Sequence, residues 1–290
     1  MEDNVYVALE QMWFDSFAQN LPWIRSGKNL ADLRGRCQSR GPVVVVGAGP
    51  SVEKFNHLAL LKGLKESTDV LATDRMLVPL MKNMVIPELS VTVDGSPKIV
   101  PFYQDPYAMG VDAVLPVYAH QPLASLVKEA YWYVPALDEG WEDPKRTPRS
   151  VTRAMVEMSG HSMAGSAYGN SGGFSWSLAE FMGHDPVILV GIDFSYGPAL
   201  APSQTPFFKG FLKQREGKVA DVIRLDFRYE DNPFGHRVLS DVSWDGYRDI
   251  FLKGAERSKI TTVNCSSYTT LHGGKIKTME LEQAIKEYNL

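Results

Sequence analysis

The sequence predicts an α/β fold, namely a Rossmann-like, mostly parallel sheet with helices on both faces and a helical N-terminal extension. Three observations predict it. Apolar runs of strand length alternate with helix-patterned segments. Val43–Val46 is a run of four β-branched residues, as in strands buried on both faces. Residues 1–40 instead place apolar side chains at helical spacing, and Pro22 should end that helix.

From residue 41 onward the pattern predicts one domain that extends to residue 290 and contains an insertion at about 196–243. Its further strands are expected at 69–74, 89–94, 111–117, 131–136, 187–192 and 260–263. Its helices are expected from residue 51 to about 61 and at 76–84, 174–182, 244–257 and 280–288. The insertion combines phenylalanines with basic residues, which suits a lid over an acceptor as well as an irregular hairpin subdomain or an oligomer contact.

Composition excludes several classes of protein. The 290 residues carry a net charge of −4, which argues against a nucleic-acid binder that depends on a basic surface. Two cysteines, Cys37 and Cys265, provide neither a disulfide framework nor a zinc site, so we expect a reducing, cytoplasmic location. No apolar run is long enough to span a membrane, and no signal-peptide pattern is present.

The segment after Val43–Val46 is Gly47-Ala48-Gly49-Pro50-Ser51, and it predicts a nucleotide-binding turn. The glycines allow a sharp turn and a close approach of the backbone to a ligand. Ser51 is a suitable N-cap for the helix that follows. Backbone N–H groups at the start of a helix bind anions, most often phosphate. These five residues are therefore candidates for nucleotide binding.

Two other interpretations of this turn remain open. Flavin and nicotinamide proteins use a similar glycine turn, but they carry a third small residue where this chain has Val52. A tight strand-to-helix turn without a ligand is also consistent with the residues. The turn lacks the Lys-Ser/Thr pair of a Walker loop.

Three aspartates, Asp74, Asp94 and Asp193, directly follow predicted strands. Ligands of parallel α/β sheets bind at the carboxyl ends of the strands, so these side chains are expected near a bound nucleotide. Magnesium binds one or two carboxylates together with substrate phosphates. For each aspartate, capping of the next helix is an alternative role.

Residues 161–175 form a second unusual stretch, rich in glycine and serine, that leads into an apolar helix. A loop of this composition before a helix N-terminus predicts a second anion site, with Asn170 and Ser171 as donors. A mobile surface loop would have the same composition.

Taken in order, several of these segments resemble the MptE-like family. They are Val-Val-Gly-Ala-Gly-Pro-Ser at 45–51, Ala-Thr-Asp at 72–74, Ile-Pro-Glu-Leu-Ser-Val-Thr-Val-Asp at 86–94, and Gly-Asn-Ser-Gly-Gly with Ile-Leu-Val-Gly-Ile-Asp within 169–193. The family includes archaeal 6-hydroxymethyl-7,8-dihydropterin diphosphokinases and bacterial motility accessory factors that resemble sialyltransferase-type enzymes. The resemblance covers roughly residues 40–195 and implies a Rossmann-like domain that binds a nucleotide with Mg²⁺.

The resemblance implies a magnesium-dependent transferase with a nucleotide donor and a small-molecule acceptor. The preferred expectation is diphosphate transfer from ATP to a hydroxymethylpterin, and the alternative is a glycosyltransferase with a CMP-sugar donor. A nucleotide-binding protein without turnover is a third hypothesis. In this interpretation Asp94 and Asp193 are catalytic and bind the metal, while Asp74 joins the nucleotide site. We expect neither nucleic acid nor membrane as a partner, and we keep a homo-oligomer open.

Overall fold

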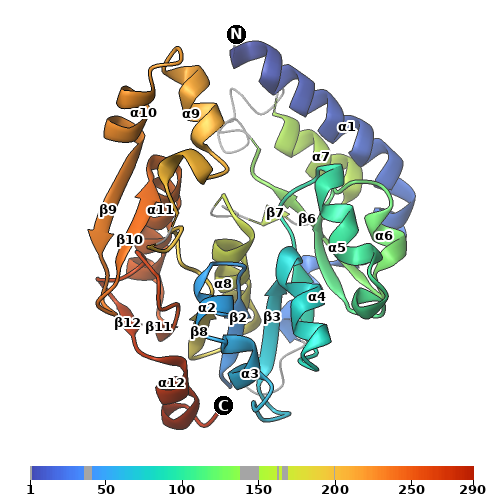
Figure 1. Ribbon diagram of the computed structural model, residues 1–290. Helices are drawn as coiled ribbons and strands as arrows, with labels where there is room; N and C mark the ends of the chain where they lie inside the picture. The colour runs from blue at the N-terminus through green and yellow to red at the C-terminus, as the bar shows by residue number, and fades with distance from the viewer. Residues whose placement is uncertain (1, 36–40, 138–149, 162, 165–168, 199) are drawn as a thin grey trace. The chain divides into compact units, whose positions relative to one another are not determined.

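The computed structural model describes residues 2–35, 41–137, 150–161, 163–164, 169–198 and 200–290 (Figure 1). For residues 2–10, 35 and 163–164 it describes the backbone alone. Cys37 and part of the glycine- and serine-rich stretch lie outside the described residues. Two compact units make up the chain: Met1–Arg40 with Val70–Gly183, and Gly41–Asp69 with His184–Leu290.

The first unit is a parallel sheet covered by helices. Its strands lie in the order β1-β6-β5-β4-β3, each neighbouring pair is parallel, and β7 adds to β6 in the same sense. Its elements are α1 (Glu2–Ser26), β1 (Lys28–Asn29), η1 (Leu30–Gly35), β3 (Asp69–Thr73), α4 (Asp74–Lys82), β4 (Leu89–Val91), η2 (Pro97–Ile99), α5 (Val100–Gln104), η3 (Pro106–Ala108), β5 (Ala113–Pro116), α6 (Leu123–Leu126), β6 (Ala130–Pro135), α7 (Val151–Ser159), β7 (Met163–Ala164) and α8 (Ser171–Met182).

Alternation along β6 shows how this sheet is covered on both faces. Trp132 and Val134 belong to a core with side chains of α1 and of α4 to α7. Tyr133 points to the opposite face, since successive side chains of a strand alternate. There its ring lies 4.6 Å from that of Phe174, on α8. The five helices therefore cover one face and α8 the other, as the predicted fold class requires.

The second unit contains a parallel sheet in the order β2-β8-β11-β12 and a separate antiparallel hairpin of β9 and β10. Every residue of β2 and β8 is buried. Its elements are β2 (Val43–Val46), α2 (Ser51–Lys54), α3 (His57–Leu61), β8 (Val187–Val190), η6 (Pro202–Gln204), α9 (Phe208–Gln214), α10 (Val219–Asp226), β9 (Phe227–Asp231), β10 (Arg237–Asp241), α11 (Val242–Arg257), β11 (Thr262–Asn264), β12 (Ile276–Thr278) and α12 (Leu281–Glu287).

Most expected strands are present but shorter, and two helix predictions are wrong. Pro22 does not end the first helix, which continues to Ser26. Phe17 and Ile24, on either side of the proline, are buried in one core, and their packing outweighs the hydrogen bond that proline removes. The helix expected from residue 51 is two short helices, because Asn56 adopts a left-handed conformation (φ 52°).

The insertion at 196–243 contains the antiparallel hairpin of β9 and β10. Helices α9 and α10 precede the hairpin along the chain. Their side chains form a small apolar cluster with Phe227 and Leu239 of the hairpin. The insertion therefore has a hydrophobic core of its own.

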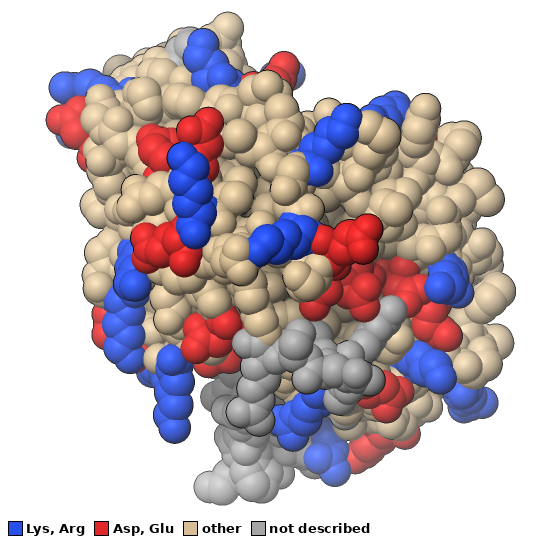
Figure 2. Space-filling view, turned by 90° about the horizontal axis from the view of Figure 1, so that it is seen from below, with Lys and Arg blue, Asp and Glu red and all other residues tan. Residues whose placement is uncertain are grey.

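The surface carries charges of both signs. In the view from below, Lys and Arg side chains are interspersed with Asp and Glu side chains (Figure 2). None of the described helices combines the length and the apolar character that a membrane span requires.

The fold predicts that Phe17→Ala destabilises the protein strongly, because it leaves a cavity where α1 packs on the sheet. We expect the free energy of unfolding to fall by about 3–5 kcal/mol in urea titrations. The matched control is Gln19→Ala, an exposed position on the same helix, which should change it by less than about 0.5 kcal/mol. Equal effects of the two changes would show that α1 is not part of this core.

Candidate functional site

In the second unit, the turn after β2 packs tightly against the turn after β8. A Cβ atom at Gly49 would lie 2.1 Å from the Oδ2 atom of Asp193 and 2.6 Å from the carbonyl oxygen of Gly191. At Gly47 it would lie 2.4 Å from a methyl carbon of Ile192. No side chain fits at these distances, so both glycines are required by contact between two turns of the protein itself. The sequence alone predicts a different reason for them, namely room for a ligand.

Most of the turn's amide groups are also engaged within the protein. The amides of Gly47 and Gly49 donate to carbonyl groups at and after the end of β8, at 2.8 and 2.9 Å. That of Ser51 donates to a carboxylate at 3.0 Å, and Pro50 has no N–H group. The expectation of a row of free amides is therefore wrong for Gly47, Gly49 and Ser51. Ala48 is exposed, and its amide forms no backbone hydrogen bond with a described residue.

The carboxylate that holds the turn belongs to Asp193, which is only 2% exposed. Its Oδ2 atom accepts hydrogen bonds from the amide and the hydroxyl group of Ser51, at 3.0 and 2.9 Å. Burial raises the pKa of Asp193 to about 6, and hydrogen bonds from Ser51 and the backbone of Tyr268 limit the rise. Its Oδ1 atom is buried and has no hydrogen-bond partner of normal geometry among the described residues.

A polar segment after β11 fixes the backbone around Asp193. The Ser266 hydroxyl group accepts a hydrogen bond from the amide of Ile192 at 2.8 Å. The amide of Thr270 donates to the carbonyl group of Asp193, also at 2.8 Å. Asn264 and Ser266 are both buried and bonded to backbone. Their hydrogen bonds to Ile192 hold the backbone next to Asp193 in place.

An aromatic cluster lies beside this turn. The ring of Phe55, just after α2, is 5.0 Å from that of Tyr268 and 5.5 Å from that of His236. Phe55 also stacks on His57, whose pKa burial lowers to about 4. The cluster joins three segments that are far apart in the sequence, so no local pattern could have predicted it.

In the first unit, Asp74 begins α4 and lies in a buried polar cluster. Its carboxylate accepts hydrogen bonds from the amide of Arg75 at 2.7 Å and from the hydroxyl group of Ser171 at 3.3 Å. Burial raises the pKa of Asp74, and hydrogen bonds from Thr92, Arg75 and Ser171 oppose that rise. Its charge in turn contributes to the raised pKa of Tyr103. The structure thus brings two expected site residues, Asp74 and Ser171, into contact.

Asn170 and Ser171 occupy the start of α8. The Oδ1 atom of Asn170 accepts a hydrogen bond from the amide of Gly173 at 2.8 Å, as an N-cap does. The first amides of any helix lack intrahelical acceptors, and here the helix is 12 residues long. The helix start remains a candidate anion site, with the carboxylate of Asp74 beside it.

Asp94 is exposed in the loop after β4. Its two carboxylate oxygens accept hydrogen bonds from the amide and the hydroxyl group of Ser96, at 2.7 and 3.0 Å. Its own amide donates to the hydroxyl group of Thr92. The carboxylate therefore supports its own turn while it stays accessible to a ligand.

The described residues fit a magnesium ion only in part. They contain no group of three or more His, Cys, Asp or Glu side chains placed to hold a metal. Magnesium does not need such a group, because it binds one or two carboxylates, substrate phosphates and water. Asp94 suits that arrangement. The burial of Asp193 and its bonds to Ser51 favour a structural role over the expected role as a metal ligand.

A family model described as 6-hydroxymethylpterin diphosphokinase MptE-like matches residues 15–198, more than half of the chain. The chain belongs to the MptE-like family. The match confirms the resemblance and includes every site residue that the sequence predicts. Among curated proteins, none matches the chain by sequence.

Among solved structures, the MptE-like chain is similar to a MAf glycosyltransferase from Magnetospirillum magneticum AMB-1. The TM-score is 0.59 at 12% sequence identity. The similarity covers 87% of this chain and 37% of that chain, so our chain spans little more than a third of the length of the protein it matches. At this identity the likeness concerns the fold.

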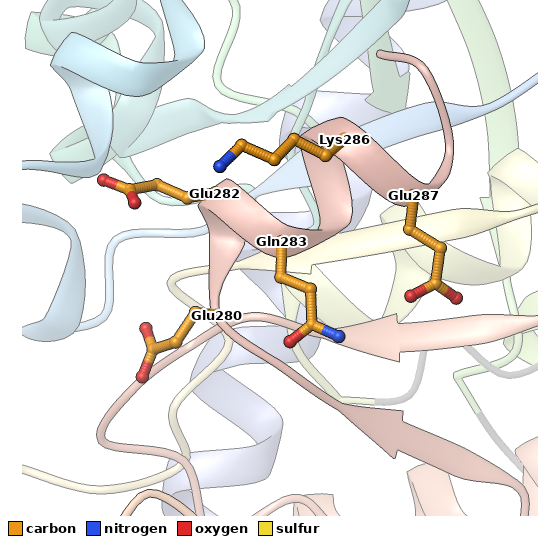
Figure 3. A pocket seen from close by; sticks show the side chains of 5 residues that line it. All are labelled: Glu280, Glu282, Gln283, Lys286 and Glu287. Carbon is orange, nitrogen blue, oxygen red and sulfur yellow. The ribbon is translucent and has the colours of Figure 1, made fainter.

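The MptE-like protein also has an open hollow of about 500 Å³ at α12, outside the matched range. It is lined by Glu280, Glu282, Gln283, Lys286 and Glu287. Lys286 extends in the direction of Glu282, while Gln283 and Glu287 point away from it (Figure 3). Three carboxylates against one ammonium group make this hollow unsuitable for a nucleotide phosphate.

The packing of the two turns predicts that Gly49→Ala destabilises the MptE-like protein even without a ligand. The new methyl group would overlap the Asp193 carboxylate, so we expect a loss of about 1–3 kcal/mol or more in the free energy of unfolding. Gly246→Ala is the matched control, because a Cβ atom there meets nothing within 4 Å. An unchanged urea midpoint for Gly49→Ala would refute the contact.

Asp193→Asn tests the buried carboxylate through pH. The folded-state pKa of about 6 lies above the ordinary 3.8, so protonation favours the folded state below pH 3.8. The parent loses this stabilisation as pH rises through 6. The stability of the asparagine variant does not change in this way, because asparagine does not titrate. The difference in free energy of unfolding, variant minus parent, should therefore rise by about 2 kcal/mol from pH 4 to pH 7. A pH-independent difference would show that Asp193 is not perturbed.

Proposed function

We propose that this protein is a magnesium-dependent transferase with a nucleotide donor, and that its reaction is diphosphate transfer from ATP to the hydroxymethyl group of a pterin, with release of AMP. The observation that carries the proposal is the family match over residues 15–198, whose description names a 6-hydroxymethylpterin diphosphokinase. The exposed carboxylate of Asp94 and the helix start at Ser171 support it, because both lie within that range.

Transfer of this kind depends mainly on positioning and on charge neutralisation. The first amides and the dipole of α8 would attract phosphate oxygens. The carboxyl group of Asp74 lies beside this helix start, and burial raises its pKa.

Asp94 would hold magnesium, and the ion would supply positive charge to the phosphates. Asp193 would act indirectly, since its hydrogen bonds to Ser51 keep the glycine turn in place.

The alternative is a glycosyltransferase with a CMP-sugar donor. It is favoured by the fold likeness to a MAf glycosyltransferase. A nucleotide-binding protein without turnover is a third candidate. ATP with a hydroxymethylpterin should give AMP in the first case, CMP or CDP should bind selectively in the second, and nucleotide should bind without product in the third.

Asp94→Asn tests the proposal by isothermal titration of ATP with and without magnesium. Asparagine can still accept the hydrogen bond from the Ser96 amide through its side-chain oxygen, and its NH2 group can donate to the Ser96 hydroxyl oxygen, so the variant should fold. Because the amide is uncharged, we expect the affinity gained on adding magnesium to fall by tenfold or more.

The control is Asp15→Asn, an exposed carboxylate on α1, which should keep the magnesium effect. Equal magnesium-dependent affinity in the parent and Asp94→Asn would leave Asp94 as a turn-forming residue. A parent protein that binds none of ATP, CTP, CMP or CDP would overturn the proposed function.

A further inference from the structure

Four large apolar side chains of the first unit are more exposed than any other large apolar side chain of the described residues. Met84 is 67% exposed, Ile86 75%, Tyr107 55% and Met109 66%, whereas Met158 of α7 is 52% and Trp23 of α1 is 44%. None of the four has a part in the candidate site. We call these four residues the apolar edge.

The topology brings the four residues of the apolar edge to the same end of two neighbouring strands. Met84 and Ile86 lie between α4 and β4, while Tyr107 and Met109 lie in and after η3, shortly before β5. Strands β4 and β5 are parallel neighbours, with Ser90 opposite Ala113. Segments that enter adjacent parallel strands reach the sheet at the same edge, its amino-terminal edge.

Side-chain contacts confirm that the two segments meet. Lys82, in the last turn of α4, lies 3.4 Å from a carboxylate oxygen of Asp105. The same ammonium group lies 5.5 Å from the centre of the Tyr107 ring. Met84 follows Lys82 by two residues, so it lies beside η3.

The size of this surface is that of a protein contact. Four large side chains, each more than half exposed, present roughly 400 Å² of apolar surface, in the range of functional patches on monomers. A standard interface buries about 800 Å² on each partner, and its centre is apolar with a polar rim. The apolar edge could therefore supply about half of one side of such an interface.

The charges at this surface favour a second copy of the chain over other partners. A symmetric dimer brings a surface against itself, so any net charge there would meet like charge. Beside the apolar edge, the charges of Lys82 and Asp105 form an ion pair and cancel. A strongly charged partner would call for an excess of one sign, and a membrane surface would call for unpaired basic residues.

We infer that the apolar edge, formed by Met84, Ile86, Tyr107 and Met109, is the centre of a symmetric homodimer interface. The inference is independent of the proposed function, because it rests on exposure, topology and charge at the amino-terminal edge of the sheet.

The double variant Ile86→Glu, Met109→Glu tests the interface by sedimentation equilibrium of the 290-residue chain over a range of micromolar concentrations. The parent should show a monomer–dimer equilibrium. The variant should dimerise at least about a hundredfold more weakly, since it brings like charges together at two former apolar contacts. Met158→Glu, which charges an exposed methionine outside the apolar edge, should leave the equilibrium unchanged.

A measurement on the parent alone makes the test independent of the folding of the variant. Hydrogen exchange at low and high protein concentration should show slower exchange for residues 84–86 and 107–109 at high concentration. A parent that stays monomeric, or a variant that dimerises like the parent, would overturn the inference. Cosedimentation of a monomeric parent with phosphatidylcholine–phosphatidylserine vesicles, lost in the double variant, would assign the apolar edge to a membrane instead.

Discussion

The second unit depends on the contact between the turn after β2 and the turn after β8. Gly49 allows the Asp193 carboxylate to approach the backbone, and that carboxylate then holds the amide and the hydroxyl group of Ser51. A buried carboxylate is costly unless hydrogen bonds compensate, and one of its oxygens has no such partner among the described residues. The close contact of the turns buries the Asp193 carboxyl group, and this burial raises its pKa.

Because of this contact, the glycine-rich turn after β2 differs from the usual phosphate-binding turn. A glycine-rich turn after a buried strand is usually associated with phosphate because it offers free amides. In this protein the amides of Gly47, Gly49 and Ser51 are used by the fold. Backbone conformation alone does not show which partner an amide takes, so the motif predicts the turn with more certainty than the ligand.

The first unit shows a related arrangement around Asp74. Its carboxylate is buried at the start of one helix and accepts a hydrogen bond from Ser171 at the start of another. Asp94, by contrast, is exposed and bonded to its own loop. The two aspartates follow strands of the same sheet and look alike in sequence, but their solvation differs, and with it the chemistry that each can perform.

Local pattern was enough to determine much of this protein. The run of valines at 43–46 predicted a buried parallel strand, because no other element suits four β-branched residues between turn signals. The ordered motifs identified the family. Local pattern did not predict three other features. These are the exposed or buried state of each aspartate, the second short helix after Asn56 and the continuation of α1 past Pro22. Asp193 shows the reason, because its hydrogen bond with Ser51 joins residues far apart in the chain, which local spacing does not encode.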